Sequence, residues 1–110
     1  MAYDEDLAHR VRAVANREPG ITEKAMFGGL AFLVHGNMAV VVRGKGGLMV
    51  RVAPQDYERR LADRGAQPAV MRGRPMSGWI IVDPEVLVRA ADVRRWVSYG
   101  LTYGRTLPPK

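Results

Sequence analysis

The chain has 110 residues, a length typical of one domain, and it contains no cysteine. Lys and Arg number 17 against 11 Asp and Glu, which gives a formal net charge of +6. Without cysteine there is no disulfide framework and no thiolate metal site. The polar N-terminus and the lack of an apolar run of about 20 residues argue against a secretory signal and a membrane span. We therefore expect one cytoplasmic domain over residues 1–110, with no membrane contact.

The basic excess is concentrated in two parts of the chain. Residues 21–53 hold four basic side chains and one acidic side chain, and residues 84–110 hold five and two. A basic balance is typical of proteins that bind polyanions, although no run of five like charges occurs here. Contact with nucleic acid and a merely solvated basic surface are both kept as interpretations.

Residues 4–18 predict an amphipathic helix. Leu7, Val11 and Val14 recur at i, i+4 and i+7, which places them on one stripe of a helix. Acidic side chains fill its first turn, where they offset the helix dipole, and a Pro-Gly pair ends it.

Four short strands separated by glycine-containing turns are predicted next, over residues 21–27, 30–34, 38–43 and 48–52. We place Met38, Val40 and Val42 on one face of the third strand. Ala39 and Val41 then lie on the other face and are apolar too. An antiparallel sheet with one face in water alternates apolar and polar residues, and this one does not. We therefore expect both faces to be covered, by helices on both sides or by a second copy; a homodimer is favoured because 110 residues supply few helices.

The second half of the chain predicts two helical regions and two more strands. The expected elements are a helix over 54–64, a linker at 67–68, a strand over 69–71, a loop over 72–75, a strand over 79–82, and a helical region over 84–106 that breaks near 90–92. Asp83 and Pro84 have the form of an N-cap and a first helical residue. Gly100 and Gly104 each cost about 1 kcal/mol in a helix interior, which indicates close approach to the sheet or to another helix. Residues 108–110 are expected to fray.

No catalytic or metal-binding constellation is found. The two histidines lie on unrelated elements, and neither serine sits in a nucleophile elbow. The glycine-rich stretch around Lys45 lacks phosphate-loop spacing and leads into a strand, so we interpret it as a hairpin turn. We therefore expect a protein that is not an enzyme and that uses no cofactor or metal.

Six residues are candidates for interaction or anion binding. Arg72 and Arg74 lie two residues apart on the predicted loop, where guanidinium groups can clamp an anion or contact a nucleic-acid backbone; the alternative is a solvated loop. The full set is Arg72, Arg74, Trp79, Arg94, Arg95 and Arg105. A further interpretation, a small enzyme or anion-binding pocket beside this loop, predicts a concave site there.

A family resemblance rests on the stretch Met26, Phe27, Gly28 and Gly29. With the Leu-Ala-Phe that follows and Gly36 to Ala39, it resembles the opening signature of the TfoX/Sxy N-terminal domain family. Further residues look like the short, single-domain members: Arg72 to Met76, Gly78, Trp79, Asp83, Pro84, Trp96 and Tyr103. The two glycines have a structural interpretation as a bulge or a position of positive φ, preferred to a ligand-binding one.

The resemblance implies an α+β two-layer fold, an antiparallel sheet flanked by helices like that of type III secretion chaperones. It also implies kinship with regulators of natural competence, which act as transcriptional co-regulators and not as enzymes. Because the sequence resembles the short members, we expect it to be without the C-terminal helical domain of the full-length regulators. The leading hypothesis is a homodimeric, non-enzymatic interaction module with a protein partner in a regulatory pathway. The alternative is a basic nucleic-acid-binding protein that uses the Arg72/Arg74 loop and the C-terminal helix.

Overall fold

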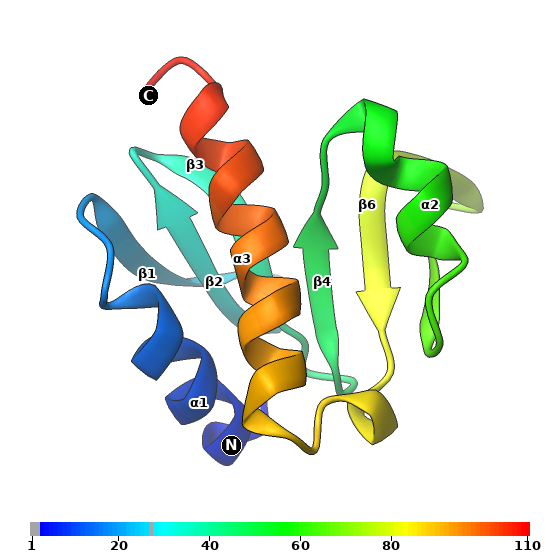
Figure 1. Ribbon diagram of the computed structural model, residues 1–110, viewed down its shortest axis with the longest axis horizontal. Coiled ribbons are helices and arrows are strands. Elements are labelled where there is room, and N and C mark those ends of the chain that lie inside the picture. Colours follow the sequence, from blue (N-terminus) through cyan, green and yellow to red (C-terminus); the bar gives the residue numbers. More distant parts are fainter. Residues whose placement is uncertain (1–2, 27) are drawn as a thin grey trace.

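A computed structural model of the chain describes residues 3–26 and 28–110 (Figure 1). Six strands form one antiparallel sheet in the order β1-β2-β3-β4-β6-β5. Their bounds are β1 Ile21–Met26, β2 Gly29–Val34, β3 Asn37–Val42, β4 Leu48–Arg51, β5 Ala66–Met71 and β6 Arg74–Val82. The helices are α1 Glu5–Ala15, α2 Tyr57–Leu61 and α3 Ala90–Thr106. The predicted α+β two-layer fold is confirmed; Phe27, placed in the first strand and in the family motif, lies outside the described residues.

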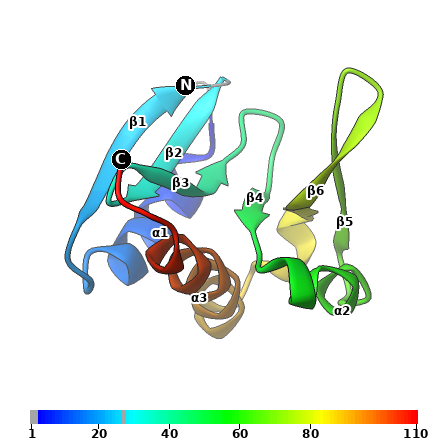
Figure 2. The same cartoon turned by 90° about the horizontal axis from the view of Figure 1, so that it is seen from above.

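All three helices lie on one side of the sheet (Figures 1 and 2). α3 packs across β2, β3 and β4, and α1 packs against α3. The core between helices and sheet includes Phe32, Val40, Val50, Ile80 and Trp96, all fully buried. The chain therefore covers one face of its sheet and not both.

A β-bulge corrects the assignment of faces in β3. Phe32 of β2 pairs with Val40, but Leu33 pairs with Met38, so Ala39 is the extra residue. Ala39 and Val40 both belong to the buried core under the helices. Met38 is half-buried and lies outside that core, so grouping it with Val40 and Val42 was wrong.

The hairpin of β5 and β6 is longer than predicted. Residues 67–68 were expected to form a linker and 72–75 a loop, but β5 includes residues 67–68 and β6 begins at Arg74. Pro68 is tolerated because β5 is an edge strand, where a missing N–H breaks no ladder on the outer side. Only Arg72 and Gly73 form the turn, with φ of 54° and 79°, the positive values that a tight two-residue hairpin turn needs.

Three helical predictions were refined by packing. The helix expected over 54–64 is a 3-10 turn at Pro54–Asp56 followed by α2, because only Tyr57 and Leu61 pack on the core and one turn is all that this contact stabilises. The expected cap at Asp83 accepts a hydrogen bond from the Glu85 amide and opens a 3-10 turn at Pro84–Val86. The helical region is broken as predicted, but the break lies at residues 87–89, and residues 90–92, where it was expected, form the first turn of α3.

The segment after α3 was expected to fray, but it is docked against the sheet. The buried Asn37 side chain donates from Nδ2 to the Pro108 carbonyl at 2.9 Å, and the Lys110 amide donates to the His35 carbonyl at 2.9 Å. Both hydrogen bonds fasten the segment to the β2–β3 turn, and the first gives a partner to the side chain of Asn37, the one buried polar or charged residue among those described.

An ion pair between α1 and β1 predicts a pH effect on stability. Arg12 donates to both carboxylate oxygens of Glu23 at 2.5 and 2.8 Å, and this lowers the pKa of Glu23 below its ordinary value of 4.5. Because the folded pKa is the lower one, the contribution is present above pH 4.5 and is lost as pH falls through the folded pKa. We expect Glu23→Gln to lower the urea midpoint slightly at neutral pH, and this difference from wild type to shrink as the pH is lowered below 4.5. Glu58→Gln, an exposed carboxylate with no ion pair in the described part of the chain, is the control; an unchanged difference at low pH would contradict the assignment.

Alanine substitutions at the two motif glycines, Gly28 and Gly29, are expected to have unequal effects on stability. Gly28 has φ +73°, and a Cβ added there meets nothing within 4 Å, whereas a Cβ on Gly29 would overlap the Val42 carbonyl oxygen. We expect Gly28→Ala to lower the free energy of unfolding by about 1 kcal/mol, from backbone strain alone. Gly29→Ala forces β2 away from the end of β3 and should lower it by about 2–3 kcal/mol. Equal urea midpoints for the two variants would contradict this account.

Candidate functional site

The face of the sheet opposite the helices, here called the open face, is apolar. Val41, Met49 and Ile81 are cross-strand neighbours in β3, β4 and β6, and they form a continuous row. Met49 and Ile81 are half-buried and do not belong to the core under the helices. Leu33 and Met38 extend this surface toward β2. The apolar pattern on both sides of the strands thus has two origins, a side packed under the helices and a side on which no helix lies (Figure 2).

A hollow of about 550 Å³ lies on the open face. Figure 2 shows the β5–β6 hairpin and the β3–β4 turn rising from the sheet on the side away from the helices. The hollow is lined by residues of both, together with the row described above; its apolar lining residues are Val41, Met49, Ala69, Val70, Met71, Met76 and Ile81. Val70 is 57% exposed and Met71 is 45% exposed, which is unusual for large apolar side chains in strands.

Two stretches that contain β2 to β6 carry all of the net positive charge. Residues 24–55 and 64–82 contain seven basic and no acidic side chains, so the rest of the chain holds ten basic and eleven acidic ones. Arg43 and Lys45 line the hollow itself. The acidic side chains belong to the helices and their connections, apart from Glu23 of β1, which is directed to Arg12 of α1. The open face is therefore bordered by charge of one sign.

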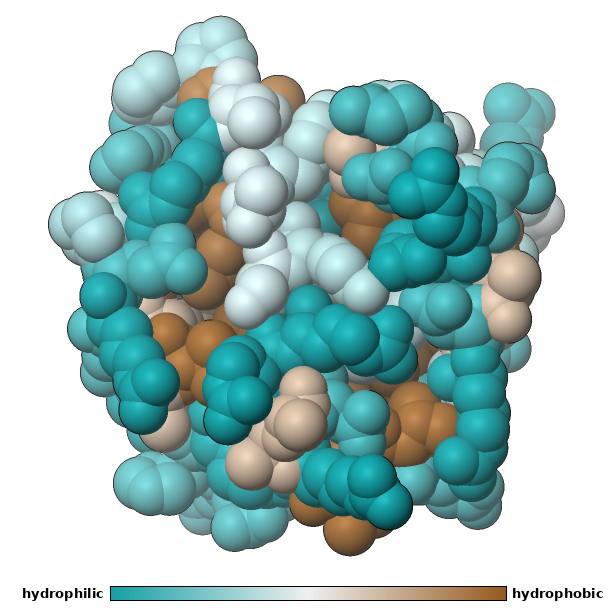
Figure 3. Space-filling view, in the orientation of Figure 1, coloured by the Kyte–Doolittle hydropathy of each residue, from teal (hydrophilic) through white to brown (hydrophobic). Residues whose placement is uncertain are grey.

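The helix side has a different character. Figure 3 shows hydrophilic side chains over most of this side, with small separate apolar areas between the helices. Acidic and basic groups are paired across it, as in Arg105 with Glu18 and Arg95 with Asp63. This side resembles the ordinary surface of a small protein.

The six predicted site residues fall into separate groups. Arg72 and Arg74 are exposed at the tip of the β5–β6 hairpin, beside the hollow but outside its lining. Arg94, Arg95 and Arg105 belong to α3, which lies on the opposite side of the sheet (Figures 1 and 2). The structure therefore does not bring the hairpin arginines and the helix arginines into one patch.

Trp79 is held by an arginine of the neighbouring strand. It pairs with Arg51 across β4 and β6, and the Arg51 guanidinium carbon lies 5.5 Å from its ring centroid. The same carbon lies 5.5 Å from the Tyr103 ring of α3. Trp79 thus packs in a cation–π stack and is half-buried, which leaves little of its face for stacking on a base.

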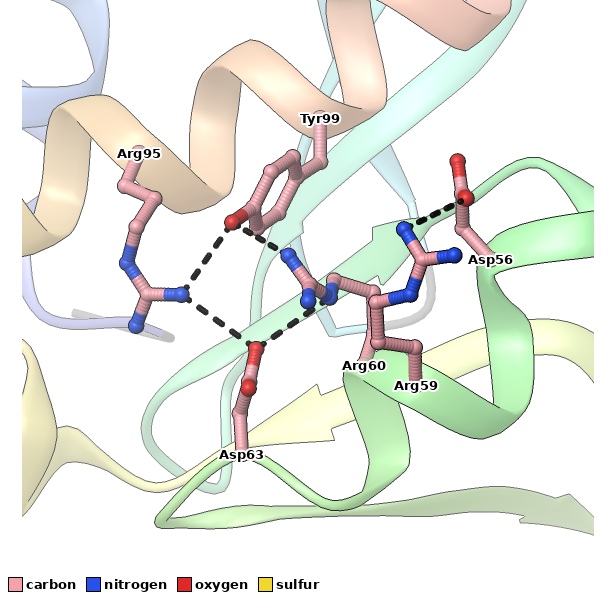
Figure 4. Close-up of polar contacts among 6 residues, drawn as sticks. All are labelled: Asp56, Arg59, Arg60, Asp63, Arg95 and Tyr99. Carbon is pink, nitrogen blue, oxygen red and sulfur yellow. Dashed lines mark hydrogen bonds and ion pairs between the residues drawn. The ribbon is translucent and has the colours of Figure 1, made fainter.

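A cluster between α2 and α3 binds these two helices together (Figure 4). The Tyr99 hydroxyl oxygen accepts hydrogen bonds from Arg60 at 2.6 Å and from Arg95 at 3.2 Å. The hydrogen bond to Tyr99 raises the pKa of the Arg95 guanidinium. Asp63 accepts from Arg95 at 3.2 Å and lies 3.3 Å from Arg60 Nε. A second hollow of about 790 Å³ lies beside the cluster, between α2 and the second half of α3. Each arginine of the cluster already has an internal partner, so we interpret the cluster as structural.

The sequence did not identify the residues that line the hollow. The signal that was present is the apolar pattern on both sides of β2 and β3, which predicted a surface in need of cover. Nothing in the sequence indicated that Val70, Met71 and Met76 line this hollow. They do so because of the β5–β6 hairpin, whose first strand contains a proline that argued against a strand. The concave site expected beside the 72–75 turn exists, but Arg72, Arg74 and Trp79 do not line it.

Two further properties concern only residues 3–26 and 28–110. No group of three His, Cys, Asp or Glu side chains in these ranges is placed to hold a metal ion. None of the helices in these ranges combines the length and the apolar character that a bilayer crossing needs. Neither finding identifies an activity.

Comparison with known proteins gives one match. Residues 13–103 match the family model described as the TfoX N-terminal domain. No match to a curated protein or to a solved structure was found. The matched range runs from the later turns of α1 into α3 and contains all six strands, so it includes the whole open face.

Proposed function

The chain belongs to the TfoX N-terminal domain family, and from this premise we propose that it is a non-enzymatic interaction module that binds another protein chain through the open face, in a regulatory role. The observation that carries the proposal is the half-buried pair Met49 and Ile81 on the open face, beside the exposed Val70 and Met71. Val41, their neighbour in the same row, is itself buried. The family's kinship with competence regulators supports the regulatory part.

A protein interface of ordinary size would cover only a small part of this chain. A specific protein interface covers about 800 Å² on each side, and the whole chain exposes 6403 Å². Contiguous apolar surface of this kind on a small protein marks interaction sites more often than it serves the monomer. Covering a half-exposed Met or Ile completely contributes on the order of 1 kcal/mol each, so a few such side chains supply useful affinity.

A matched pair of variants tests whether the partner binds at the open face. Val70→Asp with Met71→Asp places charges in the hollow at positions already exposed, so the fold should be retained. Val88→Asp makes the same kind of change at a residue that is 75% exposed and lies before α3, away from the open face. We expect a protein partner to co-purify from nuclease-treated native lysate with wild type and with Val88→Asp, and to be lost with the double variant. Retention of the same partners by the double variant would contradict the proposal.

The homodimer is one form of this proposal. A second copy on the open face would make a dimer that sedimentation equilibrium detects and that Val70→Asp with Met71→Asp dissociates. A strict monomer would leave the open face to a different protein.

Nucleic-acid binding is the second candidate, and the uniform positive charge of residues 24–55 and 64–82 favours it. In this case Arg72 and Arg74 would contact phosphates, and affinity for a DNA duplex would fall steeply with salt. Anisotropy titration at low salt tests this. Binding that Arg72→Ala with Arg74→Ala leaves unchanged would argue against the hairpin as the contact.

A further inference from the structure

We propose that the hollow on the open face binds an acidic, amphipathic α-helix of a partner protein. The inference rests on the proposed function and adds the charge and the secondary structure of the partner segment. Three observations carry it: the apolar lining with its methionines, the charge around it, and the state of the backbone that forms its floor.

The lining is suited to side chains of an amphipathic segment. Met49, Met71 and Met76 surround the row of Val41 and Ile81. Methionine is unbranched and polarizable, so it adapts to differently shaped apolar side chains, and grooves that accept helices use it for this reason. The hollow, at about 550 Å³, has room for a few apolar side chains and not for a folded domain.

The charge selects an acidic occupant over a second copy. Lys45 and Arg43 line the hollow, and Arg72 and Arg74 lie at the tip of the hairpin beside it. No acidic residue occurs in residues 24–55 or 64–82. If two copies met through this face, these cations would face the same cations, and juxtaposed like charges oppose association. A segment with Glu and Asp around an apolar stripe meets no such penalty.

The backbone selects a helix over an extended peptide. β3, β4 and β6 form the floor, and each has a strand paired on both sides, so their amide and carbonyl groups are already used. An extended peptide lying on this floor would have no ladder to join. The edge strand that borders the hollow is β5, which contains Pro68 and a register shift between Pro68 and Val70; both features oppose strand addition. A helix satisfies its own backbone groups and presents only side chains.

The test is a selection of binding peptides from a library that is biased neither in charge nor in secondary structure. The full chain is immobilised, and a display library of random peptides of about 20 residues, long enough for several helical turns, is selected on it. We expect the enriched peptides to be acidic, with apolar residues at i, i+3, i+4 and i+7, and to become helical when bound, as measured by circular dichroism. Their affinity should fall at least tenfold with Val70→Asp and Met71→Asp and stay unchanged with Val88→Asp.

Charge is tested separately with two double variants of equal net charge. Lys45→Glu with Arg74→Glu alters the surroundings of the hollow, and Arg89→Glu with Arg94→Glu makes the same change at exposed positions on the helix side. We expect the first pair to weaken the acidic peptides about tenfold at low salt and to flatten the salt dependence of binding. The second pair should leave affinity within about twofold at an ionic strength of about 0.15 M, because its positions lie on the helix side of the sheet and screening then acts over about 8 Å.

The other outcomes contradict the acidic-helix inference, the proposed function, or both. Enriched peptides that are basic, neutral or extended, or no enrichment over bare matrix, overturn the inference; if such peptides still depend on Val70 and Met71, the proposed function stands. Acidic peptides that bind independently of these two residues overturn both. A duplex DNA that binds more tightly than any peptide and depends on Lys45 and Arg74, or a dimer dissociated by Val70→Asp with Met71→Asp, assigns the face to nucleic acid or to a second copy.

Discussion

Trp96→Ala is expected to lower the free energy of unfolding by about 3–5 kcal/mol. Trp96 is the largest fully buried side chain, and it lies where α3 crosses the sheet. Its ring packs edge-to-face on Tyr99 with centroids 5.4 Å apart. Because small domains have about 5–15 kcal/mol in total, this one truncation removes a large part of the stability. Urea unfolding followed by circular dichroism measures the change.

Trp96→Phe separates ring packing from the polar atom of the indole. Within the described residues, the Trp96 indole nitrogen is buried and has no hydrogen-bond partner. An unpaired buried donor costs about 1–3 kcal/mol, and phenylalanine removes it while keeping an aromatic ring. We therefore expect Trp96→Phe to stay within about 1.5 kcal/mol of wild type. A loss as large as that of Trp96→Ala would contradict this explanation.

Gly100→Ala is expected to lower the free energy of unfolding by about 2–3 kcal/mol. In an exposed helix the same change stabilises by about 1 kcal/mol, so the sign itself is informative. A Cβ on Gly100 would lie 2.6 Å from the Ala39 carbonyl oxygen and 2.8 Å from Val40 Cγ2. The carbonyl belongs to the bulged strand of the sheet and cannot rotate away, so α3 must move outward. A stabilised variant would show that α3 does not approach β3 this closely.

Gly104 provides the matched comparison, one turn further along α3. A Cβ there meets Val34 Cγ1, which belongs to a side chain and not to the backbone. Gly104→Ala should therefore be less damaging than Gly100→Ala. In a Val34→Ala background the cost of Gly104→Ala should be smaller than in wild type, because the obstructing methyl group is gone. Additive effects of these two substitutions would contradict the contact.

The sequence was informative about which elements exist wherever hydrophobic period or turn residues mark their limits. The stripe of α1, the strands β2 to β4 and the break before α3 were all predicted, because hydrophobic period and turn residues specify them. The close approach of α3 to the sheet was foreseen from Gly100 and Gly104, and the added Cβ distances support it. The family resemblance is confirmed by the match over residues 13–103.

The rest was hidden for specific physical reasons. In β3 both sides are apolar, so alternation carries no information about register and the bulge at Ala39 left no trace. For the same reason the sequence could not show which face the helices would cover. Pro68 argued against a strand, although an edge position accepts it. The hollow depends on that strand and on the hairpin it forms, so the lining residues Val70, Met71 and Met76 were missed.

The order of elements along the chain has a consequence for biosynthesis. Each of the first four strands pairs with its neighbour in sequence, so these hairpins require only short loops to close. α3 comes after all six strands and covers β2, β3 and β4. A nascent chain that has not yet reached residue 90 therefore exposes apolar surface on both sides of its sheet, a state prone to aggregation. Translational pausing just before α3 should make the growing polypeptide depend on chaperones until that helix emerges from the ribosome.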